Sequence, residues 1–347
     1  MRLKLAALFL LPAVVTQAQT PPCPLLSAEL ITQARQLQAS VANDDTAYRL
    51  TESLTTEVGA RVAGSEADAK AVAWAEREFR KLGFDRVTLE PVRFPVWRRG
   101  DISVQVLGQS AQNLHALALG WSKSTPEAGI EAPVIELHDL DALKAATAEQ
   151  IKGRIVFVSA RMTKRIDGAD YGQRVNVRSE GAEVAAAKGA LGLVIRSIGT
   201  DQDRLPHTGM GISMSSIQPG TAAAERAMLL SNGERVALTA IPAAALSNPD
   251  ADQLSRLLAR QPDLRLKLAV AGKYLGEYTS HNVVGEITGI GKPEEVIVIG
   301  GHLDSWDVGT GAIDDASGVA ITAAALGAIK RQGLEAPADN PRRRVRE

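Results

Sequence analysis

Hydrophobic residues recur every three or four positions through the N-terminal part of the chain, which is the spacing of one helical face. This spacing predicts helices over residues 27–41, 45–58 and 65–82. Between residues 87 and 118 the period becomes two, which predicts three strands. Because Pro91 interrupts the first of these strands, we expect them at one edge of a sheet.

A polar, turn-rich stretch over residues 122–129 marks a boundary, and short apolar runs alternate with helical patterns beyond it. We expect an α/β unit with its own core between residues 131 and 270. The expected strands are residues 134–137, 154–159, 191–198, 235–240 and 264–270, and the expected helices are residues 139–150, 179–188 and 249–260.

The stretch from Glu295 to Thr322 concentrates the candidate chemistry of the chain. Val296–Ile299 is a β-branched apolar run, which predicts a buried strand in a parallel sheet. His302 and Asp304 follow the glycines that end this strand, at the carboxyl end where open α/β sheets place their sites. A glycine-containing loop then brings two adjacent aspartates, the first of them Asp314, to the start of a helix.

An imidazole with carboxylates at a strand end suits a divalent metal, and zinc accepts this set of nitrogen and oxygen ligands. A metal-bound imidazole usually has a carboxylate or a carbonyl on its other nitrogen. Asp304 is in position to orient His302 in this way, which leaves Asp314 free to bind the metal.

The segments Gly-Gly-His-Leu-Asp-Ser-Trp-Asp (300–307) and Gly-Ala-Ile-Asp-Asp-Ala-Ser-Gly (311–318) resemble the signature of the M28 co-catalytic zinc exopeptidases. The likeness extends over nearly the whole mature chain, and it is to the plasma glutamate carboxypeptidase (carboxypeptidase Q) branch of that family. The resemblance implies that His302 binds one of two zinc ions, that Asp314 bridges both ions, and that Asp304 is the catalytic aspartate.

The resemblance also implies a fold: an α/β, phosphorylase/hydrolase-like zinc exopeptidase with a mixed sheet flanked by helices and an inserted protease-associated α/β domain. The family further needs a catalytic Glu beside a ligand Glu, then another Asp and a final His, all after the next strand. Since no Glu-Glu pair follows Asp314, we expect a sheet that is incomplete at the C-terminus, as in a truncated chain. The expected divisions are a signal peptide (1–18), an N-terminal part of the peptidase domain (19–125), the insert (126–272) and the start of the zinc-binding core (273–347).

Two polar loops of the insert are candidates for holding substrate. One contains Tyr171 and Arg174, and the other contains His207. In relatives similar loops face the active-site cleft, where an Arg or a Tyr could hold a substrate carboxylate. A surface loop that binds nothing is the alternative. A solvated turn is what we expect for Arg98 and Arg99.

Composition narrows the choice of partners. The chain has 39 Lys and Arg against 40 Asp and Glu, so it lacks the positive charge that a nucleic-acid partner requires. Aromatic residues make up only 4% of the chain, which argues against a base-stacking platform. We therefore expect a peptide or dipeptide substrate and no nucleic acid, with a homodimer as a candidate assembly.

The N-terminus has the pattern of a secretory signal peptide. Arg2 and Lys4 precede an apolar run over residues 5–15, and residues 16–18 offer a small-residue cleavage site. The run is shorter than the roughly 20 residues that span a bilayer. We expect a secreted or periplasmic protein with no membrane association after cleavage, and no other stretch that could cross a membrane.

These observations favour a secreted zinc-dependent exopeptidase that hydrolyses dipeptides or short peptides through a metal-activated water. Two alternatives stay open. One is an inactive fragment or a non-enzymatic peptide-binding protein that keeps the insert as a recognition module. The other is a transferase built on the same zinc scaffold.

Overall fold

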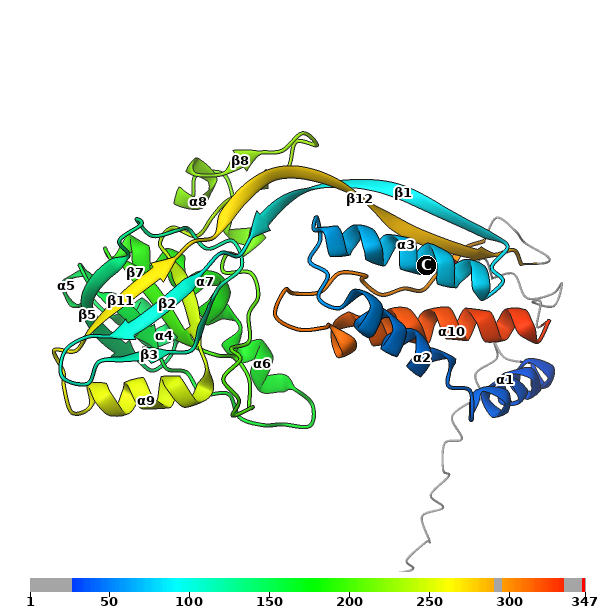
Figure 1. The fold of residues 1–347 in the computed structure, drawn as a ribbon, viewed down its shortest axis with the longest axis horizontal. Helices are drawn as coiled ribbons and strands as arrows, with labels where there is room; N and C mark the ends of the chain where they lie inside the picture. Colours follow the sequence, from blue (N-terminus) through cyan, green and yellow to red (C-terminus); the bar gives the residue numbers. More distant parts are fainter. Residues whose placement is uncertain (1–26, 290–294, 334–344, 347) are drawn as a thin grey trace, which may run out of the picture.

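The computed structural model describes residues 27–289, 295–333 and 345–346 of the chain. These residues form two lobes, joined by the long antiparallel pair of β1 (Arg86–Arg98) and β12 (Lys273–Ile287) (Figure 1). We call them the helical lobe, which contains the chain before β1 and after β12, and the insert lobe, which contains the chain between them. The predicted signal peptide, residues 1–18, lies outside the described residues.

Three helices open the helical lobe, as the hydrophobic spacing predicted. They are α1 (Ala28–Val41), α2 (Thr46–Ser53) with its π-helical continuation (Leu54–Val58), and α3 (Glu66–Lys81). Ser65 caps α3 by accepting a hydrogen bond from the backbone N–H of Asp68. The buried face of α3, with Trp74 and Phe79, packs below the β1–β12 pair (Figure 1).

The sheet of the helical lobe has the order β1-β12-β14-β13. Its last strands are β13 (Ile297–Val298) and β14 (Val345–Arg346), which pair in parallel, whereas β14 and β12 are antiparallel. The parallel pairing expected for the apolar run is confirmed. The expectation that the run is buried is wrong, since the exposed fraction of Val298 is 68%. Val298 lines a cavity of about 760 Å³ together with residues of α3, β1, β12 and α10.

The helix predicted after the two aspartates is α10 (Ser317–Arg331), preceded by a π-helical turn (Ala312–Ala316). By length and composition alone, the segment Ala312–Arg331 could cross a membrane, so the expectation that no other stretch could do so is wrong on that criterion. In the structure Val319, Ala323 and Leu326 of this helix pack against α2 and α3 in the core of the helical lobe.

The insert lobe is built on an eight-stranded sheet of order β3-β2-β11-β5-β6-β7-β10-β4. The four strands from β5 to β10 in this order are parallel, and the outer pairs are antiparallel. The strands are β2 (Ile102–Val106), β3 (Gln112–Leu114), β4 (Ala116–Ala118), β5 (Ile130–Leu137), β6 (Ile155–Val158), β7 (Gly192–Arg196), β10 (Ala243–Leu246) and β11 (Arg265–Val270).

Helices cover both faces of this sheet. On one face α9 (Asn248–Leu258) buries Leu254 and Leu258, and on the other α4 (Leu140–Ala145), α5 (Ala148–Ile151) and α7 (Asn176–Ala187) complete a second core. The remaining elements are α6 (Ala169–Arg174), a 3-10 turn (Met214–Ser216), α8 (Ala222–Glu225) and a ribbon of β8 (Met228–Leu229) and β9 (Arg235–Val236). The strand predicted over residues 235–240 is thus only two residues of a separate ribbon.

The strands predicted over residues 87–118 do not lie at one edge of one sheet. β1 belongs to the helical lobe, whereas β2 pairs with β11, and β3 and β4 form the two edges of the insert sheet. A division at residue 126 leaves β2, β3 and β4 outside the insert, although the sheet order includes them. Period-two alternation predicts that these strands exist, but it carries no information on their partners.

Candidate metal centre

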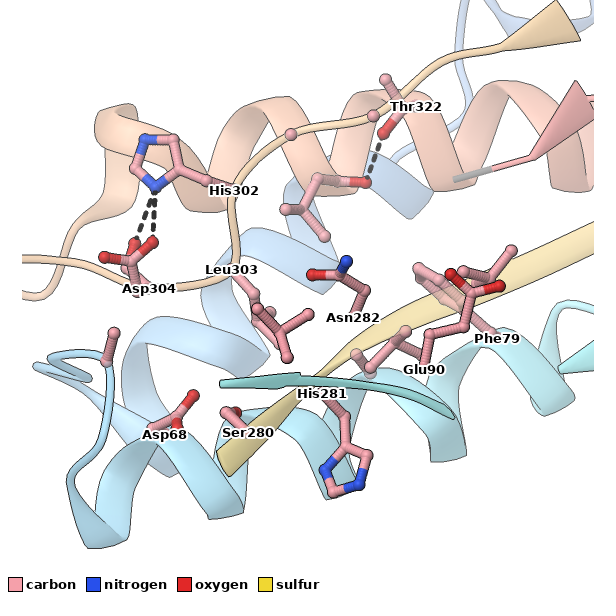
Figure 2. Close-up of a pocket in the computed structure, with 18 of the residues that line it drawn as sticks. Asp68, Phe79, Glu90, Ser280, His281, Asn282, His302, Leu303, Asp304 and Thr322 are labelled. Carbon is pink, nitrogen blue, oxygen red and sulfur yellow. Dashed lines mark hydrogen bonds and ion pairs between the residues drawn. The ribbon is translucent and has the colours of Figure 1, made fainter. Parts of the chain in front are cut away.

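The loop between β13 and α10 brings the three predicted centre residues together. Nε2 of His302 lies 2.7 Å from Oδ1 of Asp314, and Nδ1 lies 3.1 Å from Oδ1 of Asp304. His302 and Asp304 point toward each other at one side of the cavity, whereas His281, which also lines it, points away from them (Figure 2). The side chain of Asp314 is 80% exposed, so a metal and a substrate can reach this pair.

The two adjacent aspartates have different partners. Asp314 contacts the imidazole, whereas the carboxylate of Asp315 accepts hydrogen bonds from the backbone N–H groups of His302 and Gly318. A Cβ at Gly318 or Gly301 would lie within 2.6 Å of an Asp315 carboxylate oxygen, so both glycines make room for it. Asp315 therefore fixes the loop to the start of α10, which leaves Asp314 as the outward-facing carboxylate.

The electrostatics of His302 follow from these contacts. Burial lowers the pKa of this imidazole, but the hydrogen bonds and charges of Asp314 and Asp304 outweigh burial and raise the pKa above its ordinary value. Both ring nitrogens face carboxylates, which is the arrangement of a protonated imidazole.

The donor atoms are of the types that zinc accepts, but there are too few of them among the described residues for a complete zinc site. Nitrogen from His302 and oxygen from Asp314 are ligands that zinc accepts, and Asp304 on the other ring nitrogen is the orienting partner that metal-bound histidines usually have. Within the described residues, no group of three or more His, Cys, Asp or Glu side chains could hold a metal ion. The described part of the chain therefore offers two candidate ligands, His302 and Asp314, and a candidate orienting carboxylate, Asp304.

Two arginines that the sequence reading did not assign to the site hold this loop. Arg61 is fully buried and donates to carbonyls at both ends of the loop. Arg99 pairs with Asp307 in the middle of the loop, with Nε 2.9 Å from Oδ2, and its side chain is only 5% exposed. The solvated turn expected for Arg99 is therefore wrong, because contacts with Trp97, Trp306 and Asp307 cover the side chain.

Arg99 also joins the two lobes. Its guanidinium lies 5.7 Å from the ring centroid of Trp97 and 5.6 Å from that of Trp306. From the same guanidinium, Nη1 donates to the carbonyl of Ala118, and Nη2 donates to Oγ1 of Thr208 at 3.1 Å, both in the insert lobe. One side chain thus links the loop of the candidate centre to the loop that carries His207.

The structure brings Tyr171 and His207 together, with ring centroids 5.7 Å apart in an edge-on arrangement. Arg178 lies between them: its Nη1 donates to Oη of Tyr171 at 3.3 Å and lies 3.4 Å from Nδ1 of His207. Arg174 is not part of this cluster, because its Nε faces Asp170 at 3.6 Å. Arg178 stands four residues after Arg174 in a helical segment, and this spacing is the signal that could have pointed to it.

Electrostatic coupling connects this cluster to the metal pair. Burial lowers the pKa of His207 and the charge of Arg178 lowers it further, whereas Asp201 and Asp314 oppose the shift. The carboxylate of Asp314, in the other lobe, thus acts on His207.

Comparison with known proteins is consistent with this geometry. Residues 282–346 match the model of peptidase family M28. A solved peptidase M28 precursor from Shewanella amazonensis SB2B is 43% identical, with a TM-score of 0.78, over 91% of this chain and 65% of that one. The chain is related to the M28 peptidases. Its fold is thus that of the M28 peptidases, a mixed sheet flanked by helices.

Among curated M28 relatives, human carboxypeptidase Q is 34% identical over 81% of this chain, and the Xenopus laevis protein is 35% identical over 80%. The chain spans about half the length of these relatives, 54% and 53% respectively. A zinc aminopeptidase from Bacillus subtilis shares the fold. It is 21% identical, with a TM-score of 0.57, and the match covers 87% of this chain and 60% of the aminopeptidase. The expected resemblance to this branch of the family is confirmed.

Proposed function

We propose that His302, Asp304 and Asp314 form part of a zinc-dependent exopeptidase centre and that the protein acts on dipeptides or short peptides. The observation that carries the proposal is the convergence of Nε2 of His302 and Oδ1 of Asp314, 2.7 Å apart, with Nδ1 held by Asp304. The relationship to M28 peptidases supports a hydrolytic use of this arrangement.

His302 and Asp314 would hold the metal, and the remaining ligands would come from outside the described residues. Zinc, when bound, supplies a Lewis acid that polarises a peptide carbonyl and makes water more acidic. When a metal is bound, Asp304 would hold a proton on Nδ1 of His302, and Nε2, without its proton, would offer its lone pair to the metal. Asp315 holds the backbone N–H of His302 and thereby keeps the imidazole at the end of β13.

The insert lobe would recognise one end of the substrate. Arg178 has no acidic partner among the ion pairs of the described residues, and its Nη1 is anchored by Tyr171 and by the carbonyl of Thr208. A guanidinium that is anchored through one terminal nitrogen could bind the carboxylate of a short peptide through its other terminal nitrogen. Tyr171 and His207 would shape this position, and Arg174 would support it through Asp170. Secretion or export to the periplasm would bring the protein to extracellular peptides.

Hydrolysis of unblocked dipeptides tests the proposal, measured on the protein as its gene encodes it. Removal of metal by a chelator should abolish release of amino acids, and zinc should restore it. His302→Ala and Asp314→Asn should each lower kcat/KM by at least about 100-fold, because loss of an orienting partner alone typically costs 10- to 100-fold. Asp304→Asn should have an effect within that smaller range.

His281→Ala is the matched control, since it removes the same side chain type from the same cavity without touching the His302–Asp314 pair. We expect its zinc content and its kcat/KM to stay at the wild-type level. Dipeptide hydrolysis that survives both chelation and His302→Ala would rule out a metallopeptidase centre at this loop.

A further inference from the structure

Arg61 is an unusual buried residue, because its guanidinium is fully buried and bonded almost only to backbone. Nε donates to the carbonyl of Leu303 at 2.5 Å, Nη1 to those of Gly59 and Thr310 at 3.1 and 2.5 Å, and Nη2 to that of Gly311 at 3.0 Å. Four of its five N–H donors are thus satisfied by carbonyl oxygens.

The backbone of Arg61 is tied to the same loop. Its N–H donates to Oγ of Ser305 at 3.1 Å, and its carbonyl accepts from the N–H of Ser305 at 3.2 Å. These contacts join positions that are 242 to 250 residues apart in the sequence. Secondary structure does not explain them, because Arg61 lies in the irregular segment between the π-helical turn and α3.

Burying the Arg61 guanidinium costs free energy, so we ask what its contacts contribute besides packing. Burial lowers the pKa of Arg61, and the charges of Asp304 and Asp315 oppose that shift. A buried charge is tolerated only when its donors are satisfied and opposite charge is near. An apolar side chain would fill this space without that cost, so packing alone does not account for an arginine here.

The carbonyls that Arg61 holds bracket the two metal ligands. Leu303 lies between His302 and Asp304, and Gly311 lies three residues before Asp314. Gly311 has a φ of +59°, and a Cβ there would lie 2.4 Å from Cβ of Ser305 and 3.2 Å from Nη2 of Arg61. The backbone therefore closes tightly around the guanidinium at both ends of the loop.

We propose that Arg61 is a positioning residue, which sets the distance between His302 and Asp314 by holding both ends of their loop on one rigid, planar group. The inference rests on the proposed function, since it concerns the same metal pair. A guanidinium presents its donors in a fixed fork, whereas a lysine ammonium is a single point on a flexible stem. Lysine at position 61 could not hold Leu303, Thr310 and Gly311 in the same plane.

Zinc affinity, measured by competition with a chromophoric chelator, tests this role without relying on activity. We expect Arg61→Met to weaken zinc binding about 10- to 100-fold, the range for lost support of a ligand, and Arg61→Lys to fall between it and wild type. The visible absorption spectrum of the cobalt-substituted protein should shift in Arg61→Met. Millimolar guanidinium chloride, but not sodium chloride, should recover part of the zinc affinity of Arg61→Ala.

Arg99→Met is the matched control, because the Arg99 side chain is mostly covered and contacts the same loop through Asp307, but it contacts neither His302 nor Asp314. Its zinc affinity should stay within about twofold of wild type. If Arg61→Met does not fold, Arg61→Lys decides the question: a folded Arg61→Lys with wild-type zinc affinity and cobalt spectrum overturns the positioning role. Wild type that binds zinc no better than His302→Ala overturns the proposed function itself, and with it this inference.

Discussion

The two lobes differ in how their cores are assembled. The insert lobe is one continuous segment, from β2 to β11, and the central strands β6, β7 and β10 of its sheet are buried along their whole length. The helical lobe is assembled from segments at both ends of the chain, and its α1 has no buried residue. Its sheet contains a cavity of about 760 Å³ beside the candidate centre.

The two lobes differ in the sequence separation of the segments that contact one another. In the insert lobe, neighbouring segments bury one another and close a core. In the helical lobe, residues more than 200 positions apart meet through hydrogen bonds and ion pairs, as Arg61 does with the loop at 303–311. The insert lobe should therefore depend mainly on burial, whereas in the helical lobe long-range polar contacts should add to the hydrophobic core that α2, α3 and α10 form.

The largest expected effect is in the core of the insert lobe. Phe157 is fully buried in the centre of β6, so Phe157→Ala should lower the free energy of unfolding of this lobe by about 3–5 kcal/mol. Urea unfolding with hydrogen exchange of the β6 amides as the probe measures it. Val298→Ala in the exposed β13 should change stability by less than about 0.5 kcal/mol. Equal losses for the two variants would contradict the contrast between the lobes.

The junction of the lobes should give an effect of intermediate size. Arg99→Met removes a charged donor from Asp307, Thr208 and the Ala118 carbonyl. We expect the free energy of unfolding to fall by about 1.5–3 kcal/mol, which is the range for hydrogen bonds to charged groups. The side chain of Asp307 is 35% exposed, so solvent screening keeps the effect below that of a core substitution.

A double-mutant cycle with Asp307→Asn separates the pair from the other contacts of Arg99. We expect a coupling energy of at least about 0.5 kcal/mol between the two positions. Additive effects would assign the stabilisation to the other contacts of Arg99, which are those with Trp97, Trp306, Thr208 and the Ala118 carbonyl.

Local sequence patterns predicted most helices and the parallel core strands, because these depend on neighbours in the chain. The three N-terminal helices begin within one residue of their predicted positions. Edge strands were assigned to the wrong sheet, because alternation does not specify a pairing partner: β2 pairs with β11, about 160 residues later.

The candidate centre shows the same limit. His302, Asp304 and Asp314 lie within 13 positions, so their spacing in the sequence was sufficient to predict that they meet. Arg61 and Arg99 are distant from this loop in sequence, and an arginine in a turn is usually solvated. Nothing local distinguishes a buried arginine from an exposed one when its partners, the Leu303 carbonyl for Arg61 and the Asp307 carboxylate for Arg99, lie more than 200 residues away.

The smallest expected effect concerns another long-range contact of the helical lobe. Asp85, after α3, accepts hydrogen bonds from Nζ of Lys330 at 2.5 Å and from the backbone N–H of Thr288 at 2.8 Å. The hydrogen bond from Lys330 is the largest cause that lowers the pKa of Asp85 below its ordinary value of 3.8. Because the folded carboxyl binds its proton less readily than the unfolded one, its contribution is complete above the unfolded pKa and is lost as pH falls through the folded pKa.

Asp85→Asn should therefore lower the free energy of unfolding by about 0.2–1 kcal/mol at pH 7, the range for partly exposed pairs, since the two side chains are 33% and 40% exposed. The difference from wild type should shrink as the pH falls below 3.8. Urea unfolding at pH 7 and pH 3 measures this, and Lys330→Met should show the same pH dependence. A difference that is constant with pH would assign the stabilisation to packing, and the helical lobe would then resemble the insert lobe more closely than its contacts suggest.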